Sequence, residues 1–488
     1  MRFASPSLYS VCSGETPPGT MWRVGWAVAE CSGAGMAMAF TAQFAAECFN
    51  GTRASHPDFL AAKTNAAVAA FALQMVTMPF FGRTAHGRGW KRTVAVTVVM
   101  FGALLPALVV LAARGAGRTP DDQVWDFFWA TGVAGALGLP VPVAFALSRR
   151  MSVAWADQQR WLQRVGEEMQ EATTDHKVRL TAGVGQGLLP GWAVDFVERQ
   201  ATFTTMLVIP VGVMLGNQGT KLGEAGRAAD GPHEVAVLAL CMVCAGWAFA
   251  LGLMWRHERL YPPSATAGAV AAAAEGGGGG RLGLADFFPY RWLGDWQYMR
   301  YAMALCFLQF GHEAFFTLTG DHLYQMFHEA AFFDHGGFIG NVYTTGAGMV
   351  VVGLLATPLV IGPGHPNRER TICLVGLLSA LANYYSWALA GNQVGVYMAQ
   401  IVGFGALLTK PALSNLVAAV VGEGRESEAI GGLFSLGHVG SIVGVLAGKE
   451  LFETIGQNAY FVLALGPVLA IVSLYARPPC AACVRASE

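Results

Sequence analysis

Apolar segments long enough to cross a lipid bilayer recur along the whole chain, and they constrain its fold more than any other feature. Each run holds about 18 to 26 mainly apolar residues, and a helix of about 20 residues crosses the roughly 30 Å of hydrocarbon in a bilayer. In lipid only helices and closed barrels satisfy their backbone hydrogen bonds, and runs of this length favour helices. With 54% hydrophobic and 13% charged residues, the sequence predicts an all-α membrane protein.

The apolar windows predict twelve spans with a break between the sixth and the seventh. They lie near 22–48, 62–81, 93–113, 125–147, 200–216 and 235–255, and then near 299–320, 338–361, 371–390, 393–420, 428–448 and 458–476.

The segment 256–297 divides these spans into two sets of six. It contains Pro262-Pro263 and a glycine run, Gly276–Gly280, a composition typical of a flexible linker. We therefore expect two six-helix bundles, at 22–255 and 298–476. The first bundle would carry a cytoplasmic insertion at 149–199, and tails would cover 1–21 and 477–488.

The distribution of charge indicates an orientation in the membrane. Lysine and arginine are retained on the cytoplasmic side, and most of the 31 basic residues fall in the tails and loops that lie on one side of the predicted spans. This places both termini in the cytoplasm and leaves the identity of the membrane open. A net charge of −1 offers no basic field for nucleic acid.

The loop after the second span combines glycines with clustered cations. Its notable residues are Gly82, His86, Arg88, Gly89, Lys91 and Arg92. Glycines permit a tight turn, and cations can face the negative ends of helix dipoles. The spacing resembles the gating-loop signature of the major facilitator superfamily, with Gly82, Gly89, Lys91 and Arg92 matching. His86 stands where that family usually has the aspartate of a gating ion pair, so this pair would be absent or pH-dependent.

A second resemblance covers the region from Lys410 to Gly444. It looks like spans ten and eleven of the branch that contains tetracycline/proton antiporters and hippocampus-abundant-transcript-like proteins. In the same branch, Glu30 and the pair His312-Glu313 look like acidic positions of the first and seventh helices. The resemblance implies the two-bundle facilitator fold and proton-coupled transport of a small organic solute. Span five departs from the antiporter motif at Pro210 and Gly212, so the direction of coupling stays open.

Ionisable residues within the predicted spans are the main candidates for function. Each costs about 2.5–3.5 kcal/mol at the centre of a membrane helix, so such residues are functional candidates by default. Glu30 and Glu313 would carry protons, and His312 would relay protons or contact the solute. Lys410 is expected either to neutralise a carboxylate or an anionic solute, or to extend towards the interface. For Glu30 the alternative is a structural ion pair, and for His438 close helix packing is favoured.

Three further polar or aromatic residues could line a site for an amphipathic solute. They are Asn383, Tyr384 and Gln400, and helix packing is the alternative for each. No nucleotide-binding signature, cofactor motif or metal cluster is evident in the sequence. We therefore expect no enzyme activity, no cofactor and no metal. The expected partners are a small organic solute, protons and the lipid bilayer.

The altered gating loop, the departure of span five from the antiporter motif and the insertion 149–199 are the features that support an alternative function. In this alternative the chain is a transport-inactive structural subunit that keeps the facilitator fold and binds other membrane subunits.

Overall fold

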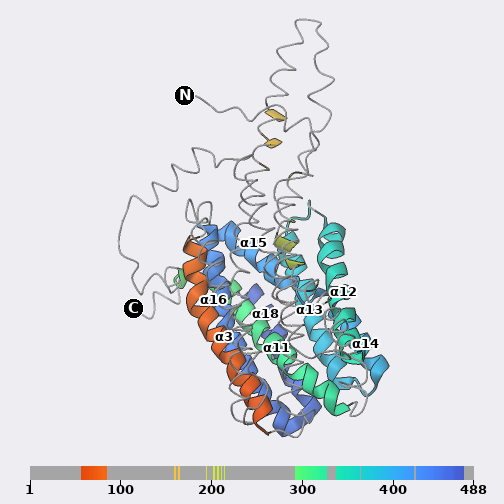
Figure 1. The fold of residues 1–488 in the computed structure, drawn as a ribbon. Coiled ribbons are helices and arrows are strands. Elements are labelled where there is room, and N and C mark those ends of the chain that lie inside the picture. The colour runs from red at the N-terminus through yellow and green to blue at the C-terminus, as the bar shows by residue number, and fades with distance from the viewer. Residues whose placement is uncertain are drawn as a thin grey trace, which may run out of the picture.

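The computed structural model describes residues 57–84, scattered positions between 156 and 214, and residues 292–326, 337–362, 364–421 and 425–476. Within these residues every regular element is an α-helix or a short 3-10 helix. The helices run side by side in a bundle (Figure 1).

The helices after residue 292 follow the predicted second set of spans. They are α11 (Trp296–Met326), α12 (Gly337–Ile361), α13 (Arg368–Leu389), α14 (Gln393–Val402), α15 (Thr409–Val421), α16 (Glu426–Ile455), α17 (Ala459–Leu463) and α18 (Leu465–Tyr475). From the first set, α3 (Pro57–Thr84) contains the predicted second span. Both α11 and α16 extend past their predicted spans, 299–320 and 428–448.

Several helices are suited to a membrane on their outer surface. Four stretches of the described residues are long and apolar enough to cross a bilayer: Asn341–Ile361, Arg368–Leu389, Gln393–Val421 and Glu428–Tyr475. Large apolar side chains lie on the outside, with Leu359 60% and Val360 85% exposed. Such an exterior is expected where the solvent is lipid. The chain is an integral, multi-pass membrane protein.

The tenth predicted span is broken in its middle. A 3-10 turn, η5 (Gly403–Gly405), separates α14 from α15. At this break the Ser379 hydroxyl of α13 donates to the Val402 carbonyl at 2.6 Å and accepts from the Gly405 amide at 2.9 Å. A Cβ at position 403 would lie 2.5 Å from Asn383 Nδ2, so a larger residue there would have to displace the Asn383 side chain. The break places Lys410 in the first turn of α15.

Helix α16 packs closely against α11. Cβ atoms at Gly440 and Gly444 would overlap the carbonyl oxygens of Cys306 and Phe310. Small residues at four-residue spacing let membrane helices approach until their backbones touch.

Helix α16 also contacts α3, which comes from the first predicted bundle (Figure 1). A Cβ at Gly431 would lie 2.7 Å from the Met78 carbonyl oxygen, and the Ser435 hydroxyl donates to the Met75 carbonyl. Helix α16 therefore joins the two halves of the chain.

Candidate functional site

A buried ion pair joins α11 to α15. Lys410 Nζ lies 3.9 Å from Glu313 Oε1, and the two side chains are 11% and 19% exposed. Removing both charges from water costs several kcal/mol per ion, and their attraction does not reliably recover it. A buried ion pair is therefore not explained by a gain in stability. Charged residues inside membrane helices are functional candidates by default, so we interpret this pair as part of a functional site.

Two histidines lie near this ion pair. Lys410 is close enough for its charge to act on the rings of His312 and His438. His312 packs edge-on against Phe316, with ring centroids 4.7 Å apart. The site therefore places two histidine rings near the buried ion pair.

His438 lies on α16 at the contact with α3. Its ring stacks on Phe71, and its Nδ1 lies 3.4 Å from the Ser441 hydroxyl. Its Nε2 has no hydrogen-bond partner among the described residues, and neither does the buried Oε1 of Gln309. Gln309 is one turn before Glu313 on α11 and lies against Gly437. The described residues thus leave two buried polar atoms without a hydrogen-bond partner, one on α11 and one on α16.

The other polar residues predicted for the solute site lie on the remaining helices of the bundle. The Asn383 side chain donates to the Ala399 carbonyl at 2.7 Å and so links α13 to α14. The Gln400 side chain lies against Gly346 of α12. Tyr384 packs 5.3 Å from Phe315, and its buried hydroxyl has no partner within the described part of the chain. Tyr384 is also near enough to Glu313 for the carboxylate charge to act on its hydroxyl. Of the three residues predicted for the solute site, Tyr384 is therefore the one placed near the ion pair.

The remaining predicted site residues lie mostly outside the described residues. Glu30 and the loop residues His86, Arg88, Gly89, Lys91 and Arg92 are among them. Gly82 is described: it lies near the end of α3, where it faces Gly431 of α16. In the stretches that are described, no group of three or more His, Cys, Asp or Glu side chains could hold a metal ion.

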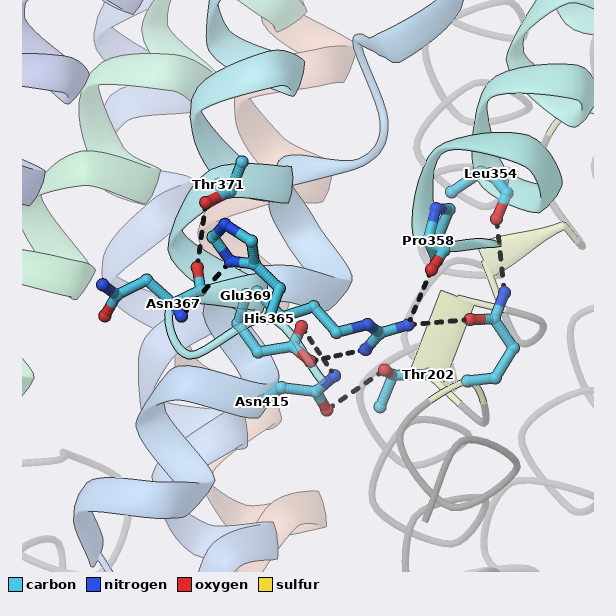
Figure 2. A network of polar contacts seen from close by, with 10 residues as sticks. Thr202, Leu354, Pro358, His365, Asn367, Glu369, Thr371 and Asn415 are labelled. Atoms are coloured by element: carbon cyan, nitrogen blue, oxygen red, sulfur yellow. Dashed lines mark hydrogen bonds and ion pairs between the residues drawn. The ribbon is translucent and has the colours of Figure 1, made fainter. Parts of the chain in front are cut away.

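A second polar network centres on Arg368, at the start of α13, and sequence reasoning missed it (Figure 2). Arg368 Nη1 donates to Glu369 Oε1 at 2.7 Å. Arg368 Nη2 donates to the Pro358 carbonyl of α12 at 3.4 Å and to Gln200 Oε1 at 3.3 Å. The predicted ninth span began at residue 371, which placed Arg368 in a loop, where a charge needs no partner.

The network continues through Asn415 of α15. Asn415 Nδ2 donates to Glu369 Oε2 at 3.3 Å, and Asn415 Oδ1 accepts from the Thr202 hydroxyl at 3.1 Å. Gln200 Nε2 donates to the Leu354 carbonyl at 3.4 Å. The Arg368 guanidinium lies over the Phe203 ring at 5.8 Å. Residues 200–203 precede the linker, so this network, like the contact of α16 with α3, joins the two halves of the chain.

Comparison with known proteins identifies the fold. No protein-family model and no curated protein sequence matches the chain. Among solved structures, it is similar to the human organic anion transporter MFSD10 (TETRAN), with a TM-score of 0.60 and 14% identity over 94% of this chain and 99% of that one. This likeness shows that the chain has the major facilitator fold.

Proposed function

We propose that the chain is a secondary active transporter that moves a small organic anion across a membrane by alternating access, coupled to protons through Glu313 and Lys410. The observation that carries the proposal is the ion pair between these residues, buried inside a bundle of membrane helices. Motion of a solute, not covalent chemistry, is the expected work of such a site.

The charges of the pair account for the coupling. While Glu313 is ionised, it neutralises Lys410 at 3.9 Å. A proton on Glu313 removes that neutralising charge, and a buried cation without a counter-ion is strongly unfavourable. A carboxylate or similar anion then replaces the lost charge at Lys410. Proton and anion therefore bind together, which is the stoichiometry of symport, and a monoanion with one proton adds no net charge to the site.

The surrounding residues support an anion rather than a cation. His312 and His438 are near Lys410, and the N–H of a neutral imidazole can donate a hydrogen bond to an anion. The buried Nε2 of His438 can act as a donor or an acceptor. The similar human protein is described as an organic anion transporter.

Uptake into proteoliposomes under an imposed pH gradient tests the proposal. The probes are labelled organic monoanions, with organic cations and neutral solutes of similar size for comparison. We expect monoanion uptake that increases as the outside is acidified. Because glutamine resembles a protonated glutamate, Glu313→Gln should retain uptake and lose its dependence on pH. Lys410→Ala should abolish uptake, and Lys410→Arg, which keeps the charge, should retain part of it.

Matched controls separate this site from general effects. Lys449 is on α16 and pairs with Glu450 and Glu453 at 3.9 Å on the surface, so Lys449→Ala should leave uptake unchanged. Glu30→Gln is measured in parallel because Glu30 is the other predicted proton carrier. If Glu30→Gln removes the pH dependence and Glu313→Gln does not, the assignment to Glu313 is wrong. If no solute moves while the protein purifies with fixed partners, the structural-subunit alternative is correct.

A further inference from the structure

Two arginines converge on one tyrosine hydroxyl where α11 and α13 begin. These helices begin at the same end of the bundle, because α12 crosses back between them. Arg300 Nη2 donates to the Tyr301 hydroxyl at 2.8 Å, and Arg370 Nη2 donates to the same oxygen at 3.4 Å. Arg300 Cζ also lies 4.8 Å from the centroid of the Tyr301 ring. We call these three residues the arginine site, in which two positive charges share one neutral acceptor.

The arginine site lacks a counter-ion within the described residues. Arg368, Lys410 and Lys449 each pair with a glutamate, whereas Arg300 and Arg370 form no salt bridge with any described residue and share the Tyr301 hydroxyl instead. Two like charges held close together repel each other, and water screens the repulsion only in part where the side chains are half-buried. An anion bound between them would remove this repulsion.

The acidic side chains nearest along the sequence are engaged elsewhere. Asp295 caps α11, where its Oδ1 accepts from two amides of the first turn at 2.8 and 3.2 Å. Glu369 accepts from Arg368 with one oxygen and from Asn415 with the other. The part of the chain that the structure describes therefore supplies no anion to the arginine site.

The chemistry of the site favours a phosphate. The Nε of Arg300 is buried and has no acceptor among the described residues, so the protein alone leaves this guanidinium incompletely bonded. Each guanidinium presents N–H donors in a planar fork that matches the oxygens of a carboxylate or a phosphate. A carboxylate carries one charge and two oxygens. A phosphate monoester carries up to two charges and three acceptor oxygens, so it can neutralise and bind both arginines at once.

The position of Arg300 on α11 favours a lipid as the source of the phosphate. Trp296, Arg300 and Met303 follow the helical repeat and share one face of α11. Trp296 is 40% exposed and Met303 is 39% exposed, so this face lies on the outside of the bundle. Tryptophan is enriched at the boundary between headgroups and hydrocarbon, and basic residues between membrane helices bind anionic headgroups there. Arg300 lies one turn beyond that tryptophan.

We propose that Arg300 and Arg370 bind the headgroup of an anionic phospholipid that carries a phosphate monoester, and that Tyr301 holds the two guanidinium groups together. The phosphate neutralises both arginines, and the acyl chains lie along the apolar face of α11 that continues at Met303. The site uses neither Glu313 nor Lys410, so it does not depend on the proposed transport.

A titration of the full chain in detergent with phosphatidic acid tests the proposal. The readout is the midpoint of thermal unfolding, which rises when a ligand binds the folded protein. We expect phosphatidic acid to raise the midpoint, and phosphatidylglycerol, a phosphate diester, and phosphatidylcholine, a zwitterion, to have little effect. Arg300→Gln and Arg370→Gln should each raise the apparent Kd about tenfold, the loss expected for a charge-assisted hydrogen bond. Arg300→Lys, which keeps the charge and loses the fork, should have an intermediate Kd.

Native mass spectrometry of the same samples counts bound lipids directly, so a variant of lower stability is still informative. Arg425 is the matched control, because it is an exposed arginine at the start of α16. Helices α14 and α15 cross back between α13 and α16, so Arg425 lies at the same end of the bundle. Arg425→Gln should leave the Kd for phosphatidic acid unchanged. An equal loss in Arg425→Gln would show general attraction to a basic surface and would overturn the proposal.

Further probes separate the possible sources of the phosphate. Inorganic phosphate and glycerol phosphate carry the same charged group without acyl chains, and we expect neither to raise the midpoint at the concentrations at which the lipid does. If they match phosphatidic acid, the site binds a free phosphate and the lipid assignment is wrong. If phosphatidylglycerol binds as tightly as phosphatidic acid, the preference for a monoester is wrong.

Discussion

The ring of His438 on α16 stacks on the ring of Phe71 on α3, with centroids 5.3 Å and planes 18° apart. This contact lies where the halves of the chain meet, and it belongs to the same histidine that feels the charge of Lys410. The ion pair is therefore close to the contact between α16 and α3. The His438 ring thus contacts α3 and also lies near Lys410.

His438→Ala should weaken the contact between α16 and α3, whereas His438→Phe should preserve it. A stacked aromatic pair contributes about 0.5–1.5 kcal/mol beyond the area that it buries. We expect a lower midpoint of thermal unfolding in detergent for the alanine variant alone. If both variants are destabilised equally, the stacking has no special role.

Glu313 and Lys410 should behave as a coupled pair in a double-mutant cycle. Removing one partner leaves an uncompensated buried charge and costs about 3–5 kcal/mol, whereas removing both with residues of similar shape is close to neutral. Glu313→Gln with Lys410→Met should therefore be more stable than Glu313→Gln alone. Thermal unfolding at pH 7, with the four proteins of the cycle, measures the coupling. Additive effects would show that the 3.9 Å contact contributes nothing.

Gly440→Ala should damage folding, because the new Cβ would overlap the Cys306 carbonyl, a backbone atom that cannot turn away. We expect destabilisation of about 1–3 kcal/mol, the usual cost of overpacking, and a reduced yield of monodisperse protein. Gly348→Ala is the matched control, since Gly348 is on α12 and a Cβ there would meet no described atom within 4 Å. That variant should be neutral or slightly more stable.

Ser379→Ala should destabilise the break between α14 and α15. It leaves the Gly405 amide and the Val402 carbonyl without the bonds that the Ser379 hydroxyl makes, and a buried unsatisfied group costs about 1–3 kcal/mol. Hydrogen exchange should increase at residues 402–406. Thr454→Val removes an exposed hydroxyl that bonds only within α16 and should change nothing. Equal exchange in both variants would contradict the role of Ser379.

The fold followed from span lengths, because the hydrocarbon thickness fixes how many apolar residues a helix needs. The break at Gly403–Gly405 was not predicted, since hydropathy is continuous there and the cause is Ser379, a residue on another helix. Glu313 and Lys410 were both singled out because charges are rare in membrane spans. Their contact depends on how α11 packs against α15, and the spacing of the two residues along the sequence does not reveal it.

The contacts that sequence reasoning missed have a common cause. Arg368 and Asn415 lie near the ends of apolar runs, where polar residues are ordinary, and their partners Gln200 and Thr202 are distant in sequence. Asn383 was predicted for the solute site, and in the fold its amide binds the Ala399 carbonyl. Its role in solute binding stays a prediction.

The approach of α16 to α11 also constrains how the sequence can change over evolutionary time. At this contact Gly440 and Gly444 face the carbonyl oxygens of Cys306 and Phe310, not their side chains. Every residue presents the same carbonyl, so this contact restricts positions 440 and 444 and leaves the identities at 306 and 310 free. Related chains should therefore keep glycine on α16 while the opposite positions of α11 diverge, and an alignment of homologues would show conservation on one helix only.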